Sequence, residues 1–315
     1  MVEPLLEVSG LKKYFKTNSG ILHAVDDVSF TIEKGKTLGI VGESGCGKST
    51  TGRCILRLIE PSDGKIVFNG IEIGKLDNRH MRAMRCEMQM IFQDPFSSLN
   101  PRKTVAQAIA EPLVEHHICK SRKELYSKVQ DLMQTVGIAE RLYNAYPHEL
   151  DGGRRQRIGI ARALALNPKF IVCDEPVSAL DVSIQAQILN LLQDLQDQFG
   201  HTYIFITHDL SVVKHLSDNI AVMYLGQILE RAPTDELFSN PLHPYTKALL
   251  SAIPIPEIGG KREHILLKGE ISQPIDPPDE CRFFERCSES CKQCLGNCPK
   301  LREVLPGHFV ACHLA

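Results

Sequence analysis

Residues 42–50 read GESGCGKST, and this stretch decides the fold. It matches the pattern G-x-x-x-x-G-K-[ST], follows the strand-like segment 36–41 (KTLGIV) and opens a helical pattern that runs from Gly47 to Leu58. Glycines at this spacing let backbone N–H groups wrap a phosphate, and the N-terminus of the following helix favours an anion. Strand, glycine loop and helix together predict a phosphate-binding loop rather than a chance glycine-rich turn.

The motif predicts a function for several side chains of the loop. Lys48 is expected to reach the β- and γ-phosphates of a nucleotide, and the Ser49 hydroxyl is expected to ligate Mg²⁺. Cys46 stands at a helix N-terminus, where a thiolate is favoured, so alkylation of Cys46 is expected to block ATP binding; the alternative is a small filler residue. The other residues predicted to contact the nucleotide are Gly42, Glu43, Ser44, Gly45, Gly47 and Thr50.

A second motif, FIVCDEP (residues 170–176), complements the loop. Four apolar residues predict a buried strand that ends in two carboxylates. Asp174 is expected to hold Mg²⁺, and Glu175, one residue further, is placed to polarise an attacking water. Together with the phosphate loop, this motif predicts a nucleoside triphosphatase.

Strand-like and helix-like patterns alternate along the rest of the chain, which predicts an α/β fold with helices flanking a largely parallel sheet. The pattern becomes helical between about 104 and 166, which predicts a helical insertion at about 94–166. In residues 183–199, apolar side chains recur with helical spacing on one face. Further strands are predicted at 21–32, 65–70, 88–92 and 202–207, with a hairpin at 219–230 and a last helix at 243–253.

Composition narrows the class of protein. The chain has 315 residues, 43% of them hydrophobic and 23% charged, with a net charge of −2. These values are ordinary for a globular protein and give no basic field for nucleic acid. The apolar runs are too short for a membrane span, and the N-terminus does not read as a secretory signal. We interpret the chain as cytosolic, so that action at a membrane would require docking on another protein.

The motifs resemble, in order, those of ABC transporter ATPase subunits, over residues 3 to about 250. The resemblance implies that Phe15 in LKKYF stacks on adenine, with Tyr14 as the alternative. It makes Gln93 the Q-loop glutamine that reaches Mg²⁺ and the catalytic water, and His208 the residue that bridges the γ-phosphate and the catalytic groups. It also assigns two short segments: the signature that faces the partner's ATP is Leu150, Asp151, Gly152, Gly153 and Arg154, and the D-loop is Ser178, Ala179, Leu180 and Asp181.

Three longer stretches, QDPFSSLNPRKTV, YPHELDGGRRQRIGIARAL and NPLHPYTKALLSAIP, are similar to the oligopeptide/dipeptide importer ATPases. That branch implies ATP and Mg²⁺ as cofactors and a peripheral position on the cytoplasmic face of the membrane. It implies a second ATPase subunit, two permeases and, as an indirect partner, an extracytoplasmic solute-binding protein. Residues 94–104 lie where the family docks the cytoplasmic helix of the permease, and the alternative for FSSLNPR is a turn-rich loop. The same branch contains transporters of nickel, glutathione and other peptide-like solutes.

Two other classes remain as alternatives. A soluble ABC ATPase of DNA repair or translation usually has two cassettes or a long coiled-coil insertion, and this chain has one cassette and no room for the insertion. A binding module with a redox-sensing tail would not need Glu175 and His208. We therefore expect an α/β P-loop ABC cassette, with a mixed sheet and a helical subdomain, at 1–253. A linker and a Cys-rich extension are expected at 254–315.

Six of the eleven cysteines fall between Cys281 and Cys312, which in a reducing cytosol favours a metal site over disulfides. The resemblance to the importers implies a 4Fe–4S cluster. Its four cysteines, matched on the framework around Pro299, are Cys281, Cys287, Cys294 and Cys312. A rival set nearly fits the ferredoxin spacing, and zinc or free thiols are further alternatives. The rival set is Cys287, Cys291, Cys294 and Cys298.

Asp151 stands where the family's signature has serine, and Arg154 stands where it has glutamine. An ionised aspartate only accepts hydrogen bonds. At about 4 Å from a phosphate oxygen it is repelled by roughly 4 kcal/mol per unit charge at an effective dielectric near 20. The alternative is that Asp151 caps the helix, with Arg154 or Arg155 neutralising it. The two interpretations are compatible, and they predict two unequal ATP sites and therefore a different partner ATPase.

Overall fold

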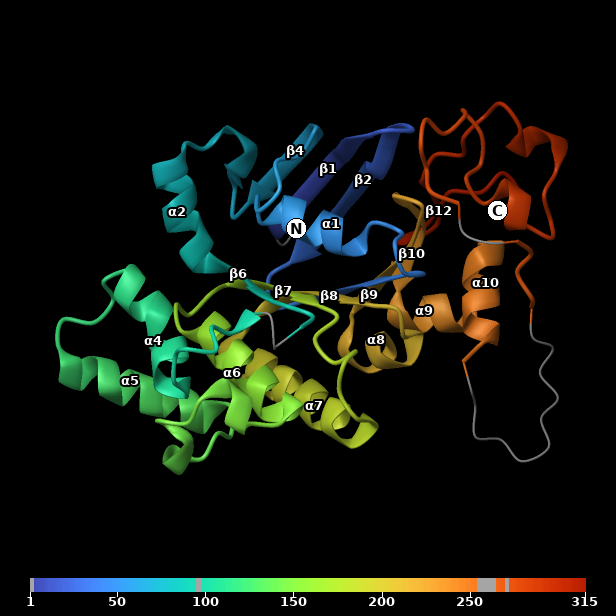
Figure 1. Ribbon diagram of the computed structural model, residues 1–315. Helices are drawn as coiled ribbons and strands as arrows, with labels where there is room; N and C mark the ends of the chain where they lie inside the picture. The colour runs from blue at the N-terminus through green and yellow to red at the C-terminus, as the bar shows by residue number, and fades with distance from the viewer. Residues whose placement is uncertain (1–2, 95–97, 254–264, 270–271) are drawn as a thin grey trace, which may run out of the picture. The chain divides into compact units, whose positions relative to one another are not determined.

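The computed structural model describes residues 3–94, 98–253, 265–269 and 272–315 (Figure 1). Residues 95–97 of the predicted permease-docking segment and 254–264 of the predicted linker lie outside the described residues. The chain forms two compact units. The first unit comprises Met1–Lys75 and Phe205–Ala315, and the second comprises Leu76–Ile204.

An antiparallel sheet opens the first unit, in the strand order β2-β1-β4-β5. Its strands are β1 (Pro4–Thr17), β2 (Gly20–Glu33), β4 (Asp63–Phe68) and β5 (Ile71–Glu72). Apolar side chains alternate along β2, where Val28, Phe30 and Ile32 are buried, as expected for a strand with one face on the core. Strand β1 was not among the predicted strands, because its pattern is broken by the charged stretch that follows Leu11.

The other strands of the first unit belong to a mixed sheet that runs β11-β12-β10-β9-β3. They are β3 (Thr37–Val41), β9 (Asn219–Tyr224), β10 (Gln227–Pro233), β11 (Arg302–Leu305) and β12 (His308–Val310). Strands β3 and β9 are parallel, whereas β9, β10, β12 and β11 pair antiparallel, so the predicted mixed sheet is confirmed. Its helices are α1 (Lys48–Ile55), α8 (Leu210–Leu216), α9 (Thr234–Ser239) and α10 (Pro244–Ser251).

The Cys-rich extension adds two strands to this sheet, which the sequence pattern did not predict. Strand β12 pairs with β10, so that Glu230 lies opposite Val310 (red and orange in Figure 1). Beneath this pairing, Nε2 of His308 donates to Oε1 of Glu230 over 2.7 Å, and both side chains are fully buried. The extension is therefore an integral part of the first unit.

The second unit contains two parallel strands, β6 (Met88–Ile91) and β7 (Phe170–Asp174), and most of the long helices. The helices are α2 (Asn78–Glu87), α4 (Val105–Glu115), α5 (Arg122–Thr135), α6 (Gly152–Leu164) and α7 (Val182–Phe199). Helices α4, α5 and α6 contact one another, as expected for the helical region between 104 and 166 (green in Figure 1). Strand β8 (Thr202–Thr207) carries the chain from the second unit into the first.

Local signals start and end these helices. Helix α4 begins with a capping box, in which Thr104 accepts from the backbone N–H of Gln107 and the Gln107 side chain accepts from the N–H of Thr104. Helix α7 buries Ile188, Leu192 and Leu195 on one face, as its spacing predicts, and ends at Gly200 in the left-handed conformation. Among the described residues, no helix combines the length and apolarity needed to cross a bilayer.

Candidate nucleotide site

The phosphate loop connects β3 to α1 and takes a shape that only glycine allows at two positions. Gly42 has φ 152° and Gly47 has φ 104°. A Cβ on Gly42 would lie 2.1 Å from the carbonyl oxygen of Met223, and one on Gly47 would lie 2.1 Å from that of Ala24. The two glycines therefore permit both the conformation and the close approach of backbone that the loop needs.

Lys48 is held inside this loop with 4% of its surface exposed. Its ammonium donates to the carbonyl oxygens of Gly42 (2.8 Å) and Glu43 (2.9 Å). Ser44 and Gly45 form the exposed tip of the loop. A cation at the centre of a ring of backbone groups, beside a helix N-terminus, is the arrangement that receives phosphates.

Cys46 corrects one expectation. The thiol is 1% exposed, and burial raises the pKa of Cys46 despite Lys48, whose ammonium lies 3.7 Å from the sulfur. The expectation of a thiolate is wrong, because the loss of hydration outweighs the helix terminus and the neighbouring cation. Cys46 is a small buried side chain that fills the loop, and alkylation at this position is expected to be slow.

Of the two aromatic residues considered for adenine, Tyr14 is committed elsewhere. Its hydroxyl donates to Oδ1 of Asp26 over 2.5 Å, and its ring stacks on His23 with the ring centroids 4.0 Å apart. Burial, followed by the hydrogen bond to Asp26, raises the pKa of Tyr14. Phe15 is half-buried and has the ammonium of Lys13 4.9 Å from its ring centroid.

The second unit brings the predicted catalytic carboxylate and the Q-loop glutamine together. Asp174, at the end of β7, is fully buried. Glu175 follows it, and its Oε2 accepts a hydrogen bond from Nε2 of Gln93 over 3.0 Å. Glu175 has φ 45°, a left-handed conformation that is strained for a long side chain and concentrates at functional sites. Its backbone carbonyl accepts from the N–H and the hydroxyl of Ser178, which ties the predicted D-loop to the backbone of Glu175.

The signature segment shows what Asp151 does locally. Its side chain caps α6 by accepting from the backbone N–H of Arg154 over 2.8 Å, and Nε of Arg154 lies 3.4 Å from the other carboxylate oxygen. The predicted helix cap is confirmed, and Arg154 is the arginine that pairs with the capping carboxylate. Arg155 is buried and donates to the carbonyl of Pro147 over 2.6 Å, so Arg154 is the exposed member of the pair.

Glycines 152 and 153 allow the start of α6 to approach the D-loop and α7. A Cβ on Gly153 would lie 2.6 Å from Ile184, and one on Gly152 would lie 3.0 Å from Leu180. Leu150, just before them, is buried. The signature and the D-loop are thus neighbours within the second unit.

In the first unit, His208 is exposed directly after β8, and Asp209 caps α8 by accepting from the N–H of Ser211.

Among the four cysteines expected to hold a cluster, three act on the pKa of the fourth, Cys281. Burial raises the pKa of Cys281 to about 12, and the thiols of Cys294, Cys312 and Cys287 act in the same direction. The backbone N–H of Cys281 donates to the carbonyl of Cys294 over 3.0 Å. Cys291 also belongs to this neighbourhood, with its sulfur 3.6 Å from that of Cys294. Within the described ranges, no three or more His, Cys, Asp or Glu side chains are arranged as ligands of a metal ion.

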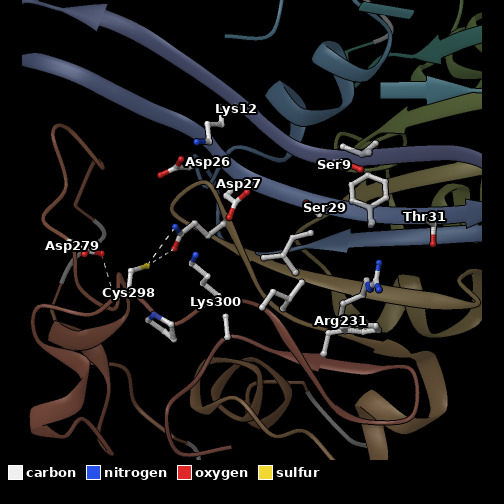
Figure 2. Close-up of a pocket in the computed structure, with 18 residues that line it drawn as sticks. Ser9, Lys12, Asp26, Asp27, Ser29, Thr31, Arg231, Asp279, Cys298 and Lys300 are labelled. Carbon is white, nitrogen blue, oxygen red and sulfur yellow. Dashed lines mark hydrogen bonds between the residues drawn. The ribbon is translucent and has the colours of Figure 1, made fainter. Parts of the chain in front are cut away.

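Cys298 belongs to a different environment, a cavity of about 670 Å³ in the first unit (Figure 2). Its sulfur lies 3.7 Å from both polar side-chain atoms of Gln227, and its N–H donates to Asp279. Charges of both signs line the cavity, among them Lys12 and Arg231 on the positive side and Asp26 and Asp27 on the negative side, so that the lining favours no single class of ligand. The sequence pattern does not indicate this cavity, because its wall combines β1, β2, β10 and the extension.

Two segments of the chain match known protein families. Residues 25–178 match the family described as ABC transporter, and residues 229–294 match the oligopeptide/dipeptide transporter C-terminal region. The chain is 52% identical to the oligopeptide transport ATP-binding protein AppF of Bacillus subtilis (strain 168), over 99% of this chain and 98% of the relative. It is 53% identical to OppF of the same organism, over 99% of this chain and 97% of the relative.

Solved structures of ABC cassettes are similar to this chain. The dimeric post-hydrolysis structure of the ATP-binding cassette MJ0796, bound to ADP and Pi, superposes with a TM-score of 0.67 at 29% identity. That match covers 73% of this chain and 98% of MJ0796. The structure of cbiO1 from Clostridium perfringens, part of the ABC transporter complex cbiONQ, also gives a TM-score of 0.67, at 28% identity over 76% of this chain and 92% of cbiO1. The chain belongs to the ATP-hydrolysing ABC transporter subunits of the oligopeptide/dipeptide importer family.

Proposed function

We propose that this chain energises the import of oligopeptides or dipeptides through two permease subunits, together with a second, different ATPase subunit. The observation that carries the proposal is identity of 52–53% with oligopeptide transport ATP-binding proteins over nearly the whole of both chains. The likeness extends through the region after the cassette, where residues 229–294 match the oligopeptide/dipeptide transporter C-terminal region. An extracytoplasmic solute-binding protein delivers the peptide, and this chain lies on the cytoplasmic face of the membrane.

The predicted residues divide between two nucleotides. Lys48 and the loop amides bind the phosphates of this chain's own ATP, Phe15 stacks on its adenine, and Ser49 and Asp174 hold Mg²⁺. Glu175 polarises the attacking water, with Gln93 and His208 as its helpers. Residues 150–154 face the nucleotide of the partner ATPase. The contact between Gln93 and Glu175 supports the assignment, because a glutamine that reaches the carboxylate is placed to orient the same water.

The same machine importing nickel, glutathione or another peptide-like solute is the second candidate, since cassettes of this branch make little contact with their cargo. A soluble ABC ATPase of repair or translation is disfavoured, because the ABC transporter family matches a single segment, residues 25–178.

Uptake measurements separate these candidates. In cells whose own copy of this chain is deleted, uptake of a radiolabelled tripeptide is expected to fall to background and to recover with the wild-type chain but not with Glu175→Gln. Nickel uptake is the control and is expected to remain unchanged. Tagged chain purified from native membranes in mild detergent should bring two permeases and one different ATPase. Co-purification with ribosomes or DNA instead would contradict the proposal.

We infer that the extension holds a 4Fe–4S cluster through Cys281, Cys287, Cys294 and Cys312. A buried thiol is a poor thiolate unless a cation compensates its charge, and an iron–sulfur cluster or zinc supplies that compensation. The thiols of Cys287, Cys294 and Cys312 all raise the pKa of Cys281, and this proximity supports the set. Cys298, by contrast, interacts with Gln227, Arg282 and Asp279 rather than with another cysteine, which disfavours the ferredoxin-like set.

Metal analysis tests this set. Chain purified without oxygen is expected to be brown and to contain about four irons, as a 4Fe–4S cluster requires. Cys287→Ser is expected to lose the iron, whereas Cys298→Ser, the matched control, keeps it. Equimolar zinc without iron would show the zinc alternative to be right, and loss of iron in Cys298→Ser would favour the rival set.

A further inference from the structure

Arg286, in the Cys-rich extension, makes a two-pronged contact with the phosphate loop. It ends the single 3₁₀ turn Phe284–Arg286, and its side chain is 9% exposed. Its two terminal nitrogens donate to Oε2 (2.5 Å) and Oε1 (3.1 Å) of Glu43, the second residue of the loop. Bidentate pairs between guanidinium and carboxylate combine charge with fixed geometry, so they hold a position more firmly than a single hydrogen bond does.

The guanidinium is itself fixed by its surroundings. Nε of Arg286 donates to the carbonyl of Lys268 over 3.2 Å. The guanidinium carbon lies 5.7 Å from the ring centroid of Tyr224, a cation–π distance. The hydrogen bonds to Glu43 raise the pKa of Arg286 further, so the guanidinium keeps its charge. Because Lys268 and Tyr224 hold the guanidinium in place, its position in turn fixes that of its third partner, the carboxylate of Glu43.

Glu43 in turn connects with the part of the loop that handles phosphate. Its backbone carbonyl accepts from the ammonium of Lys48 over 2.9 Å, and its N–H donates to the hydroxyl of Tyr245 over 3.1 Å. The side chain of Glu43 therefore lies between the extension on one side and the backbone that positions Lys48 on the other. Fixing this side chain fixes the first half of the loop.

An aromatic cluster anchors the same part of the extension. Phe283, 1% exposed, meets the ring of Tyr224 edge-on at 5.3 Å and lies 5.3 Å from the ring of Tyr245. Tyr245 is the residue whose hydroxyl accepts from Glu43. The extension thus contacts the side chain of Glu43 directly, through Arg286. It contacts the backbone of Glu43 indirectly, because Phe283 packs against Tyr245, which accepts from the N–H of Glu43.

A second arginine supports the other half of the loop. Arg282, 5% exposed, donates to the carbonyl of Leu225 and to Asp26. The next residue along the chain, Gly226, donates its N–H to the carbonyl of Cys46 over 2.8 Å. The extension therefore holds the turn between β9 and β10, and this turn contacts the backbone of Cys46. In the same way the extension holds Glu43, whose carbonyl contacts Lys48.

We propose that Arg286 is a positioning residue for ATP, which holds the phosphate loop in its binding shape through the carboxylate of Glu43. Nucleotide affinity then depends on the folded extension. The proposal rests on ATP binding by the cassette, which is common to the family, and not on the identity of the transported solute. When a loop occupies its competent shape for only a fraction of the time, the apparent dissociation constant rises by the inverse of that fraction.

Binding of ATP to the full-length chain tests the proposal. Arg286→Gln is expected to raise the Kd for ATP, measured by calorimetry, about three- to tenfold. Steady-state ATPase kinetics should show KM raised by a similar factor and kcat within about twofold, since a residue that positions the loop acts on binding. Arg286→Lys keeps the charge and loses the fork, so it should recover part of the affinity.

The control and the double variant separate positioning from general stability. Arg302→Gln removes an exposed arginine of the same extension, whose side chain donates to the carbonyl of Ala315, and should leave the Kd unchanged. Glu43→Gln should raise the Kd as Arg286→Gln does, and the double variant should be no worse than either single variant, because each acts through the other. Additive effects in the double variant would overturn the proposal. An unchanged Kd in Glu43→Gln would also overturn it, and this second measurement can be made even if Arg286→Gln does not fold.

Discussion

Glu175→Gln is expected to lower ATP turnover at this chain's own site by about 10²–10⁴-fold, the range that a positioned general base contributes. An amide cannot take a proton from the attacking water, whereas its oxygen can still accept the hydrogen bond from Nε2 of Gln93. The substitution therefore removes the base and leaves the contact in place. ATP affinity should be unchanged, because Lys48 and the loop amides are untouched.

The measurement is phosphate release by the assembled transporter at saturating ATP, with Kd for ATP determined in parallel. Glu115→Gln is the matched control: its carboxylate is exposed, and its Oε2 lies 3.9 Å from a terminal nitrogen of Arg82. That variant should keep wild-type turnover. Turnover within twofold of wild type in Glu175→Gln, or loss of ATP binding, would show that Glu175 is not the base.

The same variant addresses the inequality of the two ATP sites. The carboxylate of Asp151 faces the partner's nucleotide in the proposed assembly, and its neutralisation by Arg154 is incomplete, since both side chains are about half exposed. Most turnover is then expected at the site that uses Glu175. If the matching change in the partner ATPase abolishes transport and Glu175→Gln does not, the asymmetry is the reverse. Asp151→Ser should speed the slower site if charge limits it.

His308→Ala is expected to lower the free energy of unfolding of the first unit by about 3–5 kcal/mol. The imidazole is fully buried and donates to Oε1 of Glu230, which also accepts from the N–H of Leu242; the other oxygen accepts from the N–H of His243. Removing the ring leaves a cavity and deprives a buried carboxyl of one partner. Both effects oppose folding.

Thermal unfolding followed by circular dichroism measures this loss. A change of that size lowers the midpoint by roughly 10 °C in a unit of this length. His215→Ala, in the exposed part of α8, is the control and should shift the midpoint by less than about 1 °C, as surface substitutions usually do. A midpoint for His308→Ala that coincides with the control would mean that the pairing of β12 with β10 does not depend on this contact.

Part of the site is local in sequence and could be predicted for that reason. The phosphate loop needs a strand, three glycines and a lysine within nine residues, and the carboxylates of 174 and 175 follow directly from a buried strand. The cap formed by Asp151 was also predictable, because Ser, Thr, Asp and Asn cap helices through the backbone N–H three residues on. Each of these features depends on residues less than about ten positions apart.

The features that failed prediction depend on burial or on distant segments. Of the two interpretations of Cys46, the thiolate favoured by the nearby helix N-terminus fails because the thiol is 1% exposed, and exposure is a property of the packed molecule. Strands β11 and β12 have only four and three residues, too few for an alternating pattern to register, and they form because β10 offers an edge. The cavity around Cys298 likewise combines four segments.

The family, the phosphate loop and the predicted catalytic carboxylate can be identified from the sequence, because each depends on a short run of residues whose spacing follows from the chemistry of phosphate and Mg²⁺. The contact between the Cys-rich extension and that loop depends instead on tertiary packing. Arg286 and Glu43 are 243 positions apart, and neither residue is unusual in its own stretch of sequence. Their pairing arises because folding buries Arg286 against Tyr224, where a charge without a partner would be costly, and brings the half-buried Glu43 within reach of it.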